Sequence, residues 1–142
     1  MRPLKLLIVE DSPEDFRVTR RALQRSGVTL NISHCETGDD ALSYLQRDPD
    51  DRPDLILLDL NLPGTDGREV LRRVSSDDEL CSIPVVVLTT SSSTKDLSDC
   101  YRYGASSYIV KPVDLPKFMK MMSVFAHYWS TVVTVPSAKL YG

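Results

Sequence analysis

The chain has 142 residues, of which 42% are hydrophobic, a length and composition that suit one domain with its own core. A formal net charge of −3 provides no basic surface for nucleic acid, and three widely spaced cysteines form neither a disulfide framework nor a zinc motif. The N-terminal apolar run is far shorter than the ~20 residues that a membrane span requires. We therefore expect a cytoplasmic protein that binds neither nucleic acid nor membrane.

The first part of the chain alternates apolar runs with amphipathic stretches. Leu4–Val9 is a short apolar run that ends in two acids, as expected of a strand buried on both faces. Ser12–Asp15 combines a capping hydroxyl, a proline and two acids, which predicts the start of a helix that ends before Gly27. Thr29–Cys35 is predicted to form a second strand, and Thr37–Arg47 a second helix.

The rest of the chain repeats this alternation. The predicted strands are Leu55–Leu58, Val85–Leu88 and Ser107–Val110. They are followed in turn by the predicted helices Gly67–Val74, a helix that contains Leu97, and Val113–Trp129, with an irregular tail over Thr131–Gly142. Alternating strands and helices predict an α/β fold, in which an open parallel sheet of five strands carries helices on both faces.

Reactive side chains follow four of the five predicted strands. Glu10 and Asp11 follow the first strand, Asp59 the third, Thr89 the fourth and Lys111 the last. Because ligands of parallel α/β sheets bind at the carboxyl ends of the strands, we expect these groups to meet at one edge. Clustered carboxylates suit Mg²⁺, and one of them could then attack a phosphoryl group. Singly, each residue also fits a helix cap or a solvated surface; the prediction rests on their coincidence.

These strand-end segments resemble those of response-regulator receiver domains. The resemblance covers about residues 3–128 and rests on five segments, Glu10-Asp11, Leu55–Gly64, Asp66-Gly67, Val85–Thr90 and Tyr108–Pro112. It implies a receiver domain over residues 1–128, with a flavodoxin-like, doubly wound five-stranded parallel sheet in the order 2-1-3-4-5, flanked by five helices.

The resemblance also implies a role for each residue of the site. Asp59 matches the phosphoacceptor, and Asp11 and Asp59 match Mg²⁺ ligands, together with the backbone carbonyl of Asn61. Glu10 matches an acid that reaches the metal through water. The catalytic and switch positions matched beside Asp59 are the hydroxyl of Thr89, the aromatic ring of Tyr108 and the phosphoryl-binding amine of Lys111.

The implied function is that of a stand-alone response regulator in a two-component phosphorelay. It would take a phosphoryl group from a sensor histidine kinase, and it would be no enzyme beyond Mg²⁺-dependent self-phosphorylation and self-dephosphorylation. Since no output domain follows in the sequence, we expect its output to pass through contacts with a downstream protein. Tyr128-Trp129 and the valine-rich run that ends at Pro136 are similar to the C-terminal extension of cyanobacterial phytochrome-associated response regulators, which implies a phytochrome kinase as the phosphodonor.

The last predicted helix carries apolar residues on two sides. The stripe expected to face the sheet is Leu115, Phe118, Met119, Met122, Phe125, Ala126 and Trp129. Outside it fall Met121, Val124 and Tyr128. Either the extension over residues 129–142 or a partner subunit could cover this second side. We expect a C2 homodimer through Tyr128, Trp129 and Val133.

Three other functions are compatible with parts of the pattern. A phosphatase of the haloacid dehalogenase class needs a second aspartate two residues after the first, where this chain has Asn61. A flavin-binding module needs a Ser/Thr/Gly-rich loop after the first strand, where this chain has Glu10–Pro13. A phosphorylation-independent interaction module with a receiver fold typically lacks an acceptor-site residue, and none is missing here.

Overall fold

The computed structural model describes residues 2–136, so residues 137–142 of the predicted extension lie outside the described part of the chain. Its centre is a five-stranded sheet in which all neighbouring strands are parallel and the spatial order is β2-β1-β3-β4-β5. The strands are β1 (Leu4–Val9), β2 (Leu30–Cys35), β3 (Leu55–Leu58), β4 (Val85–Thr89) and β5 (Ser107–Val110). The predicted fold class and strand order are confirmed.

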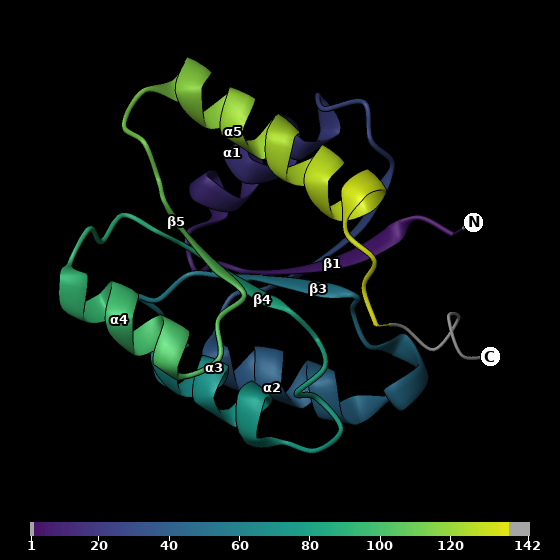
Figure 1. Cartoon of the computed structure of the whole chain (residues 1–142), viewed down its shortest axis with the longest axis vertical. Coiled ribbons are helices and arrows are strands. Elements are labelled where there is room, and N and C mark those ends of the chain that lie inside the picture. Colours follow the sequence, from purple (N-terminus) through teal and green to yellow (C-terminus); the bar gives the residue numbers. More distant parts are fainter. Residues whose placement is uncertain (1, 137–142) are drawn as a thin grey trace.

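Five α-helices cover the sheet in two layers, with α1 and α5 on one face and α2, α3 and α4 on the other (Figure 1). The helices are α1 (Pro13–Gln24), α2 (Gly38–Arg47), α3 (Gly67–Ser76), α4 (Thr94–Arg102) and α5 (Leu115–His127). A short 3₁₀ turn, Pro49–Asp51, lies between α2 and β3. No helix within residues 2–136 is long and apolar enough to cross a membrane.

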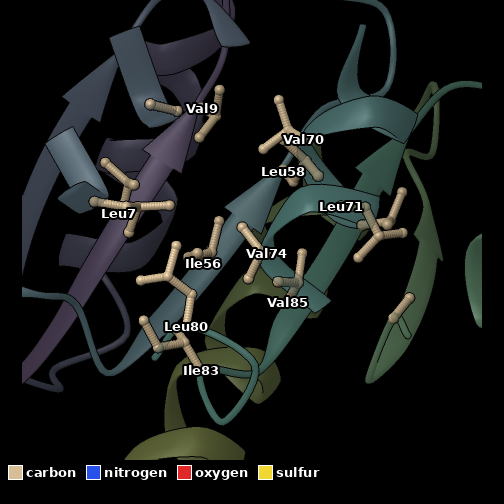
Figure 2. Packing of buried hydrophobic residues seen from close by; sticks show 14 of the residues in the cluster. Leu7, Val9, Ile56, Leu58, Val70, Leu71, Val74, Leu80, Ile83 and Val85 are labelled. Atoms are coloured by element: carbon tan, nitrogen blue, oxygen red, sulfur yellow. The ribbon is translucent and has the colours of Figure 1, made fainter. Parts of the chain in front are cut away.

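The central strands β3 and β4 are apolar except for the last residue of β4, because helices bury both of their faces. Every residue of β3 and β4 is buried, including the polar Thr89 that ends β4. Alternate side chains of these strands therefore enter two separate cores. In the core between the sheet and α3, Ile56 and Leu58 of β3 pack beside Val70 and Val74 of α3 (Figure 2). This rigid double-sided packing fixes where the strands end.

The second core lies between the sheet and helices α1 and α5. As predicted, one stripe of α5 faces the sheet, and its buried members are Phe118, Met122, Phe125 and Ala126. Leu115 is the exception, with 56% of its surface exposed. Side chains of a helix tilt toward its N-terminus, so Leu115, the first residue of α5, points beyond the helix end and away from the core.

The C-terminal segment folds back onto its own domain. A π-helical turn, Tyr128–Val132, continues α5, so the irregular tail begins later than predicted. Trp129 keeps to the core-facing stripe and is only 9% exposed, and Val133 and Val135 pack against the same core. This differs from the expectation that Trp129 and Val133 offer their apolar groups to a partner, because the π turn returns both side chains to the domain itself.

Candidate functional site

Three acidic side chains meet at the carboxyl end of the sheet. Each of Glu10, Asp11 and Asp59 has a carboxylate oxygen within 4.8 Å of the other two. Glu10 and Asp11 follow β1, and Asp59 follows β3, which is the neighbour of β1 in the sheet. Parallel neighbours end at the same edge, so the topology brings these acids together, as the sequence predicts.

Backbone contacts fix the position of Asp59. Its N–H donates to the Val9 carbonyl at 3.1 Å and so extends the β1–β3 pairing past the last residue of β3. Behind it, α3 begins at Gly67, where a Cβ atom would collide with the Asp59 carbonyl oxygen and with Leu60. A glycine is therefore required for this close approach. The Asn61 N–H donates to the Asp59 carboxylate at 3.3 Å, which places Asn61 directly beside the site.

Glu10 is buried and paired with the cation of the site. Its Oε1 accepts a hydrogen bond from Lys111 Nζ at 2.8 Å, and its Oε2 accepts from the Ser12 N–H at 3.2 Å. Burial raises the pKa of Glu10, and the charge of Asp59 adds to this effect, although Lys111 acts in the opposite direction. The upward direction is set mainly by the burial of the carboxyl group. Separately, the cluster holds three carboxylates and Glu10 is paired with one ammonium group, which leaves an excess of negative charge.

Lys111 reaches this edge from the end of β5. Its backbone N–H donates to the Thr89 carbonyl at 2.7 Å, and its side chain is only 14% exposed. Burial lowers the pKa of Lys111, but the hydrogen bond to Glu10 and the charges of Glu10 and Asp59 outweigh it and raise the pKa. The amine is thus held as a cation against the acidic cluster.

The residues matched to the switch lie along β4 and β5. Thr89 is fully buried, and its Oγ1 accepts a hydrogen bond from the Ser91 N–H at 3.2 Å. The Tyr108 hydroxyl donates to the Ser91 carbonyl at 2.9 Å. Both groups therefore bind the loop between β4 and α4. A movement of Thr89 that shifts Ser91 would change the hydrogen bond of Tyr108.

Arg68 and Asp96 add a second attachment to this loop that sequence reasoning missed. Arg68, on α3, forms an ion pair with Asp96, on α4, at 2.8 Å, and the Ser91 hydroxyl donates to Asp96 at 2.7 Å. These bonds from Ser91 and Arg68 lower the pKa of Asp96. No local pattern could have paired them, because the two residues lie 28 positions apart on different helices.

The donor set suits a hard divalent cation. Three carboxylates supply oxygen ligands at one edge of the sheet. Lys111 is the cation that acts on Glu10, so the three negative charges meet a single positive charge there. Mg²⁺ and Mn²⁺ prefer oxygen ligands and keep several waters, which a half-open edge admits. Asp11 is exposed and Glu10 is buried, so Asp11 is the more accessible of these two carboxylates.

Comparison with known proteins identifies the family. The model of the response regulator receiver domain matches residues 6–123, a range that includes all the residues of the site described in this subsection. The chain belongs to the response regulator receiver domain family. This confirms the resemblance to receiver domains that the strand-end segments indicated.

Among receiver proteins, the chain is similar to regulators of phytochrome signalling. It is 38% identical to the response regulator Rcp1 of Synechocystis sp. over 140 residues, 96% of this chain and 95% of that protein. The structure of Mn²⁺-bound Rcp1 superposes with a TM-score of 0.89 at 37% identity, covering 95% of this chain and all of that one. The structure of the phosphorylated cyanobacterial phytochrome response regulator RcpA superposes with a TM-score of 0.90 at 38% identity, covering 96% of this chain and 100% of that one.

The acidic cluster predicts that Mg²⁺ stabilises the receiver domain. A ligand that binds only the folded state at about 100 times its Kd adds about 2.7 kcal/mol to the free energy of unfolding. Replacing Asp11, an exposed member of the cluster, with alanine should remove most of this gain and should relieve repulsion in metal-free buffer. Urea denaturation with Mg²⁺ and with EDTA measures both effects.

Asp78→Ala serves as the control, because Asp78 is an exposed acid outside the cluster. This variant should keep the full stabilisation by Mg²⁺. The assignment of Asp11 is contradicted if Asp11→Ala gains as much stability from Mg²⁺ as Asp78→Ala does.

Proposed function

We propose that this receiver domain is a phosphorylation-operated switch whose acceptor is Asp59. The observation that carries the proposal is the convergence of three carboxylates within 4.8 Å, one of which holds the Lys111 amine. Asp59 is the member of the cluster that lies between β1 and β4 at the centre of the edge. The phosphodonor would be the phosphohistidine of a sensor histidine kinase.

The chemistry is an in-line transfer to a carboxylate. An oxygen of Asp59 attacks the phosphorus of the phosphohistidine, a new O–P bond forms, and the P–N bond to the histidine breaks. The Lys111 amine stabilises negative charge on the transferred oxygens. Asp11, Asp59 and the Asn61 carbonyl would hold Mg²⁺, with Glu10 acting through water, and the ion supplies further charge stabilisation for the phosphoryl oxygens.

Transfer would change the contacts of Lys111 and Thr89. A phosphoryl group adds negative charge and three acceptor oxygens beside Asp59. Lys111 would then divide its hydrogen bonds between Glu10 and the phosphoryl group, and the Thr89 hydroxyl would donate to a phosphoryl oxygen. Since Ser91 is bonded to both Thr89 and Tyr108, the β4–α4 loop and α4 would move with them. The altered face of α4, β5 and α5 would contact a downstream protein.

A groove beside Lys111 offers a docking surface for the kinase. It has a volume of about 230 Å³ and runs between α1 and the start of α5. Exposed apolar side chains line it next to the acceptor site, namely Val18, Val113 and Leu115. A helix that carries the phosphohistidine could bury these groups while its imidazole reaches Asp59.

The names of related proteins suggest which kind of histidine kinase is the phosphodonor. RcpA is named a cyanobacterial phytochrome response regulator, and two further structural neighbours, RtBRR and AtBRR, are named bacteriophytochrome response regulators. We therefore propose a phytochrome histidine kinase as donor, a stand-alone regulator as recipient, and the cytoplasm as their place of contact. A phosphorylation-independent module is the alternative, and it is less favoured because the acceptor, metal and lysine positions are all filled.

Asp59 is predicted to be the single phosphoacceptor. Incubation with acetyl phosphate and Mg²⁺ should add one phosphoryl group by intact-mass spectrometry, and Asp59→Asn should abolish this addition because it removes the nucleophile. Asp15→Asn is the control, since Asp15 is an exposed aspartate that lies beside Lys111 but outside the acidic cluster. Undiminished labelling of Asp59→Asn would contradict the proposal.

We also propose a homodimer, formed through a groove on the outer side of α5. The groove has a volume of about 550 Å³ and lies between β5 and α5. Lys120, Val124 and Tyr128 follow one another along it at i, i+4 spacing, with Val124 61% and Tyr128 49% exposed. Trp129 lines the groove but is largely buried, and Val133 packs on the core of its own domain. Tyr128 is therefore the member of the predicted interface that remains available.

A two-fold axis through Val124 would pair these side chains favourably. In an antiparallel pair of α5 helices, each Val124 meets its copy, and each Lys120 meets Tyr128 of the partner rather than another lysine. A lysine over a tyrosine ring contributes about 0.5–1 kcal/mol at an exposed site. The pairing therefore buries exposed apolar area without opposing like charges.

Val124→Glu is predicted to shift the protein toward monomer, because it places two carboxylates at the two-fold axis. Sedimentation equilibrium at micromolar concentration measures the shift. Val18→Glu is the control, since Val18 is also an exposed helical valine but lies on α1. If the unchanged protein sediments as a monomer, with and without beryllofluoride, the dimer proposal is wrong.

A further inference from the structure

The peptide unit between Glu10 and Asp11 is held from the neighbouring edge strand. On β2, the Cys35 carbonyl accepts a hydrogen bond from the Glu10 N–H at 3.0 Å. The Glu10 carbonyl oxygen lies 2.8 Å from His34 Nε2. A carbonyl oxygen only accepts, so Nε2 must carry a proton and donate it. Both backbone groups of Glu10 are therefore bound to β2.

The ring of His34 is itself held in place by α1. It stacks on the Phe16 ring, with 3.7 Å between the ring centroids and an interplanar angle of 5°. The Arg20 guanidinium lies over the same Phe16 ring, 5.4 Å from its centroid. Such a stack restricts the rotation of the imidazole and aims Nε2 at the Glu10 carbonyl. His34 is thus a polar side chain fixed by an aromatic partner toward the backbone of the acidic cluster.

The hydrogen bond from His34 acts on the Glu10–Asp11 peptide unit, whose conformation is opposed by repulsion between carboxylates. The carboxylates of Glu10 and Asp11 belong to adjacent residues, and both lie near Asp59, so their repulsion favours rotation of the peptide unit that joins them. A hydrogen bond to the Glu10 carbonyl opposes this rotation, because that carbonyl belongs to the Glu10–Asp11 peptide plane. His34 touches the backbone of the cluster rather than its carboxylates.

We infer that His34 is a positioning residue for the divalent-cation site, which its hydrogen bond to the Glu10 carbonyl keeps ready to bind. The inference rests on the proposed function, because it concerns the same cation. Groups that orient metal ligands from outside the ligand set typically change metal affinity 10- to 100-fold. The contact here is to a ligand's backbone and is partly exposed, so we expect the lower end of this range.

Two substitutions of His34 separate positioning from packing. His34→Leu removes the donor and keeps an apolar side chain against Phe16, while His34→Gln keeps an N–H donor at a similar reach. We expect His34→Leu to weaken Mg²⁺ binding about tenfold by isothermal titration calorimetry, and His34→Gln to restore most of the affinity. Asn31→Leu is the control, since Asn31 is an exposed polar residue of the same strand, at its other end.

Thermal denaturation in EDTA checks that all three variants fold, and the affinities then decide the question. Unchanged Mg²⁺ affinity in folded His34→Leu would overturn the inference while leaving the proposed function intact. Equal weakening in His34→Gln and His34→Leu would overturn the donor role of His34. If the unchanged protein binds no Mg²⁺, the proposed cation site fails and this inference fails with it.

Discussion

Repulsion among Glu10, Asp11 and Asp59 is the constraint on which the site depends. Two unit charges about 4 Å apart near a protein surface repel by roughly 4 kcal/mol, and by less where water screens an exposed group such as Asp11. Lys111 offsets part of this cost through its 2.8 Å bond to Glu10. The offset is incomplete, because three carboxylates meet there and Lys111 supplies a single positive charge. A divalent cation, as we propose for this site, would complete the balance.

The fold supplies the rigidity that such an arrangement requires. Strands β3 and β4 are buried on both faces, so their carboxyl ends cannot retreat from one another. Gly67 lets α3 begin against the backbone of Asp59, and β2 binds the backbone of Glu10. The β4–α4 loop, by contrast, is held mainly by hydrogen bonds between side chains and Ser91 rather than by strand pairing. Charge added at Asp59 would therefore be relieved by movement of that loop rather than of the sheet.

The sequence predicts well both the elements and the edge at which the acids meet, because both depend on local patterns. Apolar runs mark strands buried on both faces, and the residues after them must reach one edge in a parallel sheet. Periodicity also places Phe118 and Phe125 in the core, but it could not show that Leu115 overhangs the end of α5. It likewise could not show that a π turn directs Val133 back to the domain.

Contacts between distant elements escaped prediction altogether. The Arg68–Asp96 ion pair and the stack of Phe16 on His34 join residues from separate elements whose spacing carries no signal. Each residue taken alone looks like an ordinary surface or strand position. Such partners meet only in the folded domain, where β2 lies beside β1, α1 contacts β2 and α4 contacts β5.

The location of a bound cation tests the central claim most directly. Crystals of the protein grown with Mn²⁺ should show one anomalous-difference peak among the carboxylates of Asp11 and Asp59 and the carbonyl of Asn61, with Glu10 near enough to reach it through water. Lys111 should remain paired with Glu10. Crystals that show no peak at this edge of the sheet, with Mn²⁺ in large excess, would contradict the account.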